Sequence, residues 1–292
     1  MIERVLILGT GLLGTSTGLA LRAAGFTGSI IGWDKDPKQS QTALALKGID
    51  SVAPEPLAAA KASQLILLAG PVYAILDWME QLAGILTPAH LVTDVGSTKS
   101  LITEAGNRLF NQAARAGFLP GHPMAGKEVS GAISADATLF RDAVWIFTTE
   151  SGECGSDCPE MPAEAARLAA GWREWVQAMG CRTLDLDAAR HDELVGWVSH
   201  LPQFVATALT ALLQTEVGDA PELTAVGGRA LREMTRLGAS PYSMWRDVAY
   251  TNTETIAAAL HALEQRLAHI RENLRTPELR SEFDLANRFR KG

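Results

Sequence analysis

Two short stretches of this 292-residue sequence carry side chains suited to proton chemistry. His122 lies between Gly121 and Pro123, and Ser97 lies in the run Gly-Ser-Thr-Lys at residues 96–99. An imidazole titrates near neutral pH, so His122 could accept a proton from a hydroxyl group or hydrogen-bond to it. Each residue also has a structural interpretation, as a loop histidine bonded to backbone and as a serine that caps a helix. Neither His122 nor Ser97 is by itself sufficient evidence of a catalytic site.

The C-terminal part of the chain offers different chemistry, because its fixed positive charge comes from arginine. No lysine occurs between Glu128 and Arg290. Arginine stays protonated and can bind a carboxylate through two parallel hydrogen bonds, but it is a poor proton shuttle. We therefore expect an anion-binding Arg236 here, at a helix end and with Glu233 one turn before it. We expect solvated or acid-paired roles for three other arginines of this part, Arg229, Arg232 and Arg246.

A glycine-rich loop near the N-terminus predicts a dinucleotide site. Gly9, Gly11 and Gly14 form Gly-x-Gly-x-x-Gly between an apolar run at residues 5–8 and a helical pattern at residues 12–24. Such glycines permit a tight turn, close approach of backbone to a pyrophosphate, and close packing of the helix. The helix N-terminus, with Leu12 and Leu13, would add free N–H groups for the phosphates.

The expected cofactor is NAD. A second apolar run, at residues 29–33, ends at Asp34, twenty residues after Gly14. Asp34 can accept hydrogen bonds from both ribose hydroxyls and would repel a 2′-phosphate, although Lys35 and Lys38 could partly neutralise one.

The elements that must position these residues alternate regularly up to residue 186. We expect further strands at residues 64–69, 91–95, 118–121, 143–148 and 182–186. We expect helices at residues 38–47, 58–62, 72–85, 100–116 and 163–179. This pattern predicts an α/β fold with a doubly wound, Rossmann-type parallel sheet. Because ligands bind outside the carboxyl ends of such strands, the glycine loop, Gly70-Pro71, Ser97 and His122 should lie together, with Ser97 also near the cofactor.

After residue 186 the pattern becomes helical. We predict an NAD-binding domain at residues 1–186 and a helical dimerisation and substrate-binding domain at residues 187–292. Its helices are expected at residues 188–217, with a kink at Pro202, and at residues 221–236, 241–273 and 277–290. The first is apolar almost all round, so we expect it to be buried on several sides at the interface of a homodimer.

Composition narrows the function classes. The formal net charge is −7 and no basic face is evident, which argues against nucleic-acid binding. No apolar run is long enough to span a bilayer, and Glu3-Arg4 at the start argues against a signal peptide. The three cysteines, Cys154, Cys158 and Cys181, suit a reducing cytoplasm better than a disulfide framework. Cys154 and Cys158 lie in a Gly/Pro-rich loop without histidine, so no metal site is expected.

The chain resembles the prephenate dehydrogenase family over nearly its whole length. This family includes arogenate and cyclohexadienyl dehydrogenases. The motifs that carry the resemblance are Gly9-Thr10-Gly11-Leu12-Leu13-Gly14, Asp94-Val95-Gly96-Ser97-Thr98-Lys99, Gly121-His122-Pro123-Met124-Ala125-Gly126, Ser199-His200-Leu201-Pro202, Glu233-Met234-Thr235-Arg236 and Met244-Trp245. The first is shared by most Rossmann enzymes, and the middle motifs are specific to the family.

The resemblance implies NAD-dependent oxidative decarboxylation of prephenate to 4-hydroxyphenylpyruvate in tyrosine biosynthesis, or of arogenate to tyrosine. His122 matches the catalytic histidine that contacts the ring hydroxyl, Ser97 a serine that bonds the same hydroxyl, and Arg236 the arginine that binds a substrate carboxylate. The resemblance also places five further residues at the substrate, namely Lys127, Glu128, His200, Gln203 and Trp245. Trp245 matches a position where a residue can cross the dimer, and the second domain matches a helical dimerisation domain.

Two departures concern substrate choice. Gln203 stands where many prephenate enzymes have histidine, and Glu233 stands where an aspartate is expected. A neutral amide can meet a ketone or an ammonium, so we expect prephenate turnover with measurable arogenate activity, and a shift toward prephenate in Gln203→His. We expect Glu233 to hold the Arg236 guanidinium. No chorismate mutase segment is expected before the fold, and no regulatory domain after it.

Two alternatives remain open beside this family. A β-hydroxyacid dehydrogenase has the same architecture, but it places a lysine on the first helix after the sheet domain, where this chain has none. A catalytically silent dinucleotide-sensing protein would keep the glycine loop but would not need His122, Ser97 and Arg236 together. Turnover of prephenate and arogenate with both cofactors would separate these possibilities.

Overall fold

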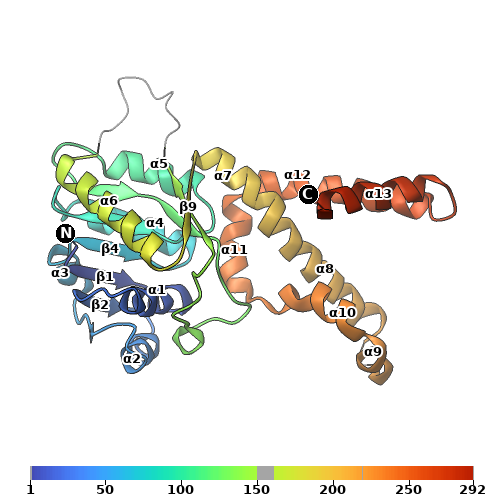
Figure 1. Cartoon of the computed structure of the whole chain (residues 1–292), viewed down its shortest axis with the longest axis horizontal. Coiled ribbons are helices and arrows are strands. Elements are labelled where there is room, and N and C mark those ends of the chain that lie inside the picture. The colour runs from blue at the N-terminus through green and yellow to red at the C-terminus, as the bar shows by residue number, and fades with distance from the viewer. Residues whose placement is uncertain (1, 150–160, 219, 292) are drawn as a thin grey trace.

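The first part of the chain folds around a six-stranded parallel sheet with the order β3-β2-β1-β4-β5-β6 (Figure 1). The computed structural model describes residues 2–149, 161–218 and 220–291. The strands are β1 (Arg4–Leu8), β2 (Ser29–Trp33), β3 (Ser51–Val52), β4 (Leu65–Leu68), β5 (Leu91–Asp94) and β6 (Gly117–Leu119). The helices between them are α1 (Leu12–Ala23), α2 (Pro37–Ala45), α3 (Pro56–Lys61), α4 (Val72–Ala83) and α5 (Ser100–Leu109). This confirms the doubly wound fold class, and β3 is an edge strand that the sequence did not predict.

The sheet is buried on both faces, which explains the continuous apolar runs of its strands. Side chains of a strand alternate between the two faces. In β4, Leu65 and Leu67 join one apolar cluster, which includes residues of α1 and of α6 (Ala163–Ala178). Ile66 and Leu68 join the other, with residues of α4 and α5. These two clusters fix the carboxyl ends of β1, β4 and β5, where the candidate residues follow.

A second, three-stranded sheet corrects the expectation that residues 143–148 and 182–186 extend the parallel sheet. It consists of β7 (Gly121–Pro123), β8 (Val144–Thr148) and β9 (Arg182–Leu186), with β7 antiparallel and β9 parallel to β8. The strand expected at 118–121 is divided at Pro120, which has no N–H for a ladder. Its second part therefore pairs with β8, and this places His122 in the smaller sheet.

The helix expected at residues 100–116 ends earlier, at Leu109. Phe110 is extended, and Asn111 has a left-handed φ of 54°, a conformation that asparagine tolerates. The Asn111 side chain then accepts a hydrogen bond from Phe118 N (2.7 Å) and donates one to Phe118 O (3.2 Å). These bonds tie the chain to β6 and end the helix.

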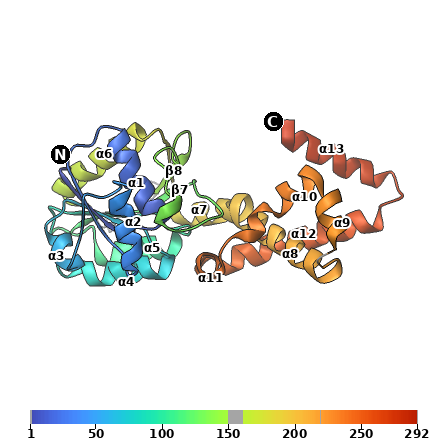
Figure 2. The same ribbon diagram turned by 90° about the horizontal axis from the view of Figure 1, so that it is seen from below.

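The rest of the described chain is helical and extends away from the α/β part (Figure 1 and Figure 2). Its elements are α7 (Ala188–Val195), the π-helical turn η2 (Gly196–His200), α8 (Leu201–Glu216), α9 (Pro221–Val226), α10 (Gly228–Thr235), the 3₁₀ turn η3 (Arg236–Ala239), α11 (Tyr242–Thr251), α12 (Thr253–Glu272) and α13 (Glu278–Lys291). No strand occurs after β9 in the residues that the structure describes. None of the described helices is long and apolar enough to cross a membrane.

Three of the helices expected in this part are interrupted. The helix expected at 188–217 contains the π turn η2 just before Pro202, where a proline without an N–H cannot continue the regular ladder. The helix at 221–236 breaks at Gly228, which has a φ of 56°. The helix at 241–273 breaks at Asn252, whose side chain bonds Asp192 O and His200 Nδ1.

Candidate active site

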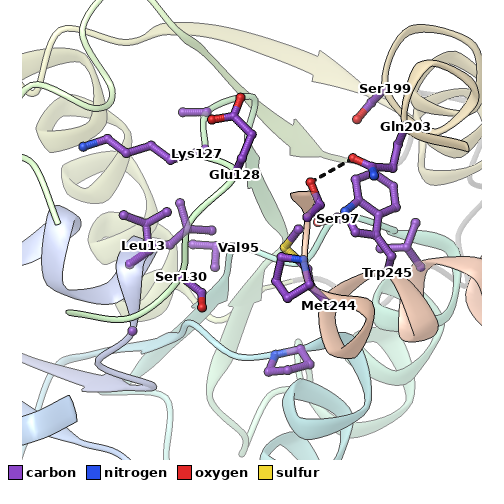
Figure 3. A pocket seen from close by; sticks show the side chains of 18 of the residues that line it. Leu13, Val95, Ser97, Lys127, Glu128, Ser130, Ser199, Gln203, Met244 and Trp245 are labelled. Atoms are coloured by element: carbon purple, nitrogen blue, oxygen red, sulfur yellow. Dashed lines mark hydrogen bonds between the residues drawn. The ribbon is translucent and has the colours of Figure 1, made fainter. Parts of the chain in front are cut away.

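A cavity of about 570 Å³ lies between the α/β part and the helical part. Its walls come from the glycine loop, from the ends of β4 and β5, from the segment after β7, and from η2, α8, η3 and α11. Leu13 and Ser130 lie on one side of the cavity, and Gln203 and Trp245 lie on the other (Figure 3). The candidate residues that line it are Gly11, Leu12, Leu13, Gly70, Pro71, Ser97, His122, Lys127, Glu128, His200, Gln203, Arg236 and Trp245.

The glycine loop has the geometry of a pyrophosphate cradle. A Cβ on Gly9, whose φ is 102°, would lie 2.5 Å from Ala69 O, and a Cβ on Gly14 would lie 2.0 Å from Gly9 O. Both positions therefore need glycine for close packing under the loop. A Cβ on Gly11 would meet nothing within 4 Å, so the loop is open on that side. Gly11 also begins α1 without a side-chain cap, which leaves the first N–H groups available to an anion.

Asp34 supports the loop from the end of β2. One carboxylate oxygen accepts a hydrogen bond from Thr10 N (2.8 Å), and the other accepts one from Asp36 N (3.0 Å). Each oxygen keeps a further lone pair. Asp34, Gly9 and Gly14 do not line the cavity itself. The cradle and the carboxylate together fit a dinucleotide, with the phosphates at Gly11 and a ribose at Asp34.

His122 and Ser97 present unpaired polar atoms to the cavity. His122 is 8% exposed, and its Nδ1 lies 2.8 Å from Nε2 of His191. Among the described residues, neither Nε2 of His122 nor the hydroxyl of Ser97 has a hydrogen-bond partner. Burial lowers the pKa of His122 well below its ordinary value, and the nearby His191, Lys99 and His200 lower it further. The imidazole is therefore neutral and able to accept a proton.

A buried ion pair holds the backbone beside His122. Gly121 N donates to Asp94 Oδ1 (3.1 Å), and Lys99 Nζ donates to Gly121 O (2.7 Å) and pairs with Asp94. A Cβ on Gly121 would lie 2.6 Å from Nε1 of Trp145, so only glycine fits. Asp94 and Lys99 belong to one of the motifs that carry the family resemblance, but no role was expected for them from the sequence. Their five-residue spacing across the end of a strand was the available signal.

His191 and Asp192 extend the contacts of His122 into the helical part, and neither residue was expected from the sequence to belong to the site. His191 Nδ1 lies 2.8 Å from Asp192 Oδ1. Asp192 also accepts from Lys99 N (2.7 Å) and Ser100 N (2.9 Å). Burial lowers the pKa of His191 against the effect of its bond to Asp192. Burial disfavours the charged form of Asp192, but hydrogen bonds from His191, Ser100 and Lys99 outweigh it and lower its pKa.

Two helices of the α/β part are capped by carboxylates from the helical part. The helix α5 begins at Lys99 without a side-chain cap of its own, and Asp192 accepts its first N–H groups. The helix α4 begins at Pro71 without a side-chain cap, and Asp247 accepts from Tyr73 N (3.3 Å). Both carboxylates lie at the positive end of a helix dipole.

Arg236 pairs with Glu128 at the cavity, and this corrects the expected role of Glu233. The Arg236 side chain is 60% exposed and Glu128 is 29% exposed. Glu233 instead pairs with Arg229 at 3.3 Å. Arg236 lies at the end of α10, as its C-cap, and begins η3. Lys127 lines the cavity, but its ammonium donates to Ser134 O (3.0 Å) and pairs with Asp136 (3.2 Å).

Gln203 lines the cavity as expected, and its amide is engaged by protein groups. Its Nε2 donates to Leu237 O (2.8 Å) and lies 3.2 Å from Thr207 Oγ1. Its Oε1 accepts the hydroxyl of Ser240 at 3.1 Å. Gln203 is 3% exposed. Ser240 also lines the cavity. Gln203 therefore acts on the cavity through the Ser240 hydroxyl that it binds.

His200 and Trp245 form the wall beside α8. Burial lowers the pKa of His200 to about 4. Because the Asn252 amide donates to Nδ1 of this neutral ring (3.2 Å), its proton lies on Nε2. Trp245 packs within its own chain, with its ring 5.9 Å from His200 and 6.0 Å from Phe204. The buried Trp245 Nε1 has no hydrogen-bond partner among the described residues.

Comparison with known proteins places both parts of the chain in one family. Residues 17–155 match the family model "Prephenate dehydrogenase, nucleotide-binding domain", and residues 187–290 match "Prephenate dehydrogenase, dimerization domain". A prephenate dehydrogenase of Lactococcus lactis is 30% identical over 270 residues, which cover 92% of this chain and 70% of that protein.

Two solved structures share the whole architecture. Prephenate dehydrogenase from A. aeolicus, in complex with hydroxyphenyl propionate and NAD+, superposes with a TM-score of 0.80 at 29% identity. The match covers 100% of this chain and 96% of that one. Arogenate dehydrogenase from Synechocystis has a TM-score of 0.74 at 26% identity, with 99% of each chain covered.

Proposed function

The chain belongs to the prephenate dehydrogenase family, and we propose that it decarboxylates prephenate oxidatively to 4-hydroxyphenylpyruvate with NAD, in tyrosine biosynthesis. It is an NAD-dependent dehydrogenase. One observation carries the proposal of its chemistry. The unpaired Nε2 of the neutral His122 and the hydroxyl of Ser97 line the same cavity as the glycine cradle.

The reaction removes a hydride and carbon dioxide from the substrate, whereas the hydroxyl proton leaves the oxygen only transiently. Prephenate is a cyclohexadiene with a ring hydroxyl opposite a quaternary carbon that bears a carboxylate. NAD, when bound, supplies the hydride acceptor. His122 Nε2 accepts the hydroxyl proton as the carbon beneath it is oxidised, and Ser97 orients that hydroxyl. Carbon dioxide leaves the opposite carbon, and the electrons of the broken bond make the ring aromatic. The phenolate oxygen formed in this way takes its proton back from His122.

Arg236 binds a substrate carboxylate in this proposal. Its guanidinium is paired with Glu128 in the structure, so the substrate carboxylate replaces the Glu128 carboxylate. The exchange exposes Glu128 to solvent rather than burying an unpaired charge. The side-chain carboxylate is the better partner for Arg236, because strong binding of the departing carboxylate would stabilise the ground state and slow its loss.

A second substrate, arogenate, is favoured by the Ser240 hydroxyl. Arogenate carries an ammonium where prephenate has a ketone. Ser240 donates its proton to Gln203 Oε1, so toward the cavity its oxygen can only accept. An accepting oxygen suits an ammonium and offers nothing to a ketone. We therefore propose that the enzyme also turns over arogenate.

The test of the proposed function is His122→Asn, measured with prephenate and NAD. We expect folded protein that binds substrate and loses on the order of 10²–10⁴ in kcat, the usual contribution of a general base. The matched control is His261→Asn, because His261 is 70% exposed on α12. A His122→Asn variant with nearly full kcat would contradict the assignment.

We further propose the division into a dinucleotide-binding domain at 1–186 and a dimerisation and substrate-binding domain at 187–292. Apolar side chains on the helical part support a homodimer: Leu212, Phe283 and Phe289 are 57%, 64% and 90% exposed in the single chain. Such surfaces are normally covered by a partner. The free, buried Cys181 suits the reducing cytoplasm that we propose as the location.

A further inference from the structure

We propose that His191, oriented by Asp192, fixes the tautomer of His122, so that Nδ1 carries the proton and the lone pair of Nε2 faces the substrate. His191 and Asp192 are positioning residues, because they act through His122. The proposal rests on the proposed function, in which His122 accepts the hydroxyl proton.

The direction of the two hydrogen bonds follows from the chemistry of Asp192. Its Oδ1 accepts from Lys99 N and its Oδ2 from Ser100 N, which is the arrangement of an ionised carboxylate. An ionised carboxylate can only accept. His191 Nδ1 therefore carries a proton and donates it to Asp192 Oδ1 over 2.8 Å. A neutral His191 then has an unprotonated Nε2.

The protonation of His191 in turn fixes the direction of its hydrogen bond to His122. Nε2 of His191 is an acceptor, so Nδ1 of His122, at 2.8 Å, must be the donor. A neutral imidazole carries one proton, so Nε2 of His122 is bare. Nε2 is also the ring nitrogen of His122 without a protein partner in the described chain. Asp192, acting through His191, thus determines that Nε2 of His122 is the nitrogen that can accept the substrate proton.

The reversed chain of bonds is disfavoured by the surroundings. It would need Asp192 to be a neutral acid that donates to His191, but both oxygens of Asp192 already accept backbone N–H groups. His191 is fully buried and Asp192 is 4% exposed, so water cannot replace a lost bond cheaply. The lowered pKa of Asp192 agrees with the ionised form.

The same hydrogen bonds can remain after His122 has taken the proton. The imidazolium keeps its Nδ1–H bond to His191, and the negative charge of Asp192 lies at the far end of that chain. The charged groups around it are Lys99 before α5, Asp94 at the end of β5 and Asp192 on α7, with neutral His200 from η2 nearby. In serine protease triads a carboxylate orients the catalytic histidine by a direct bond, whereas here His191 stands between Asp192 and His122.

The first test measures the tautomer directly. In protein labelled with [¹⁵N]histidine, the two ring nitrogens of a neutral imidazole have well-separated chemical shifts. We expect His122 to show a protonated Nδ1 and an unprotonated Nε2, assigned by comparison with His122→Asn. A wild-type His122 with its proton on Nε2 would overturn the proposal without any further variant.

The second test uses a pair of variants at His191. His191→Phe removes the acceptor, whereas His191→Gln places an amide oxygen where Nε2 of His191 lies. We expect His191→Phe to mix the two tautomers of His122 and to lose kcat on the order of 10²-fold, less than the ~10⁴-fold loss of a triad histidine locked in the wrong tautomer. KM should change little. His191→Gln should restore the Nδ1–H signal and most of kcat.

The outcomes separate the two proposals. An unchanged His122 tautomer and kcat in folded His191→Phe would overturn the positioning role. A loss of kcat in both variants, with the wild-type tautomer kept, would also overturn it, because it would show a packing role for His191. If His122→Asn keeps full activity, the proposed function fails, while the ¹⁵N spectrum still decides the tautomer.

Discussion

Arg236 and Glu128 form an ion pair at the cavity although they come from different parts of the chain, one from η3 and one from the segment after β7. We expect Arg236→Ala to raise KM about 10- to 100-fold, since a hydrogen bond to a charged group contributes about 1.5–3 kcal/mol. The exposed Arg232 provides the control, and Arg232→Ala should leave KM unchanged.

A variant of Glu128 tests whether this residue competes with the substrate carboxylate for Arg236 or binds the substrate itself. If the substrate carboxylate displaces Glu128, then Glu128→Gln should lower KM modestly, by about two- to fivefold, because a neutral amide is a weaker competitor than a carboxylate. A KM that rises as much as in Arg236→Ala would show that Glu128 binds the substrate itself.

Stability should fall as the pH is lowered from 6.5 toward 4. Burial lowers the pKa of His122, His191 and His200, with His200 at about 4. Between the unfolded and folded pKa values the unfolded chain binds more protons, so the free energy of unfolding decreases as pH falls. Each group contributes up to about 1.4 kcal/mol per pH unit. Urea unfolding at pH 7, 6 and 5 measures the slope, and a flat profile would mean that these rings are charged or open to water.

Substrate choice should depend on Ser240 rather than on a direct contact of Gln203. We expect Ser240→Ala to lower kcat/KM for arogenate by about two- to tenfold more than for prephenate, the contribution of one hydrogen bond. Gln203→Leu should act in the same direction, because it frees the Ser240 hydroxyl to donate. Equal losses of kcat/KM for both substrates would show that Ser240 does not determine substrate choice.

Cofactor choice should depend on Asp34. We expect the wild-type enzyme to prefer NAD and Asp34→Ser to gain activity with NADP, because the substitution removes the charge that repels a 2′-phosphate. Lys35 and Lys38 then remain to attract it. The measurement is kcat/KM for both cofactors. A wild-type enzyme that uses NADP as well as NAD would show that Asp34 serves only its bonds to Thr10 N and Asp36 N.

The exposed apolar side chains of the helical part should hold two chains together. Leu212→Glu on α8 and Phe289→Glu on α13 should shift the mass measured by light scattering at micromolar concentration from dimer to monomer. Leu57→Glu is the matched control, because Leu57 is 38% exposed on α3 of the α/β part. A wild-type monomer would contradict the proposed dimer.

The structural features that could be predicted from the sequence are those set by residues close to one another along the chain. The tight turn at Gly9, the strand before it and the helix after it are local, and so is the placement of His122 after a short strand. The sequence did not reveal His191, which lies 69 residues from His122, because the contact exists only once α7 docks against β7. It also misjudged Glu233. Helical spacing brought this acid close to Arg236, but Arg229, one turn earlier, is equally close and Glu128 reaches Arg236 from the other part.

The carboxylates of Asp192 and Asp247, which complete the first turns of α5 and α4, tie the melting of the two parts together. An α/β part cut free at residue 186 would lose both caps, each worth about 1 kcal/mol, and Gly70-Pro71 of the cradle leads directly into α4. The two parts that the sequence divides at residue 186 should therefore unfold together rather than as independent domains. Calorimetry of the whole chain should show one transition, and a dinucleotide bound at the glycine loop should raise the melting temperature of helices that it never touches.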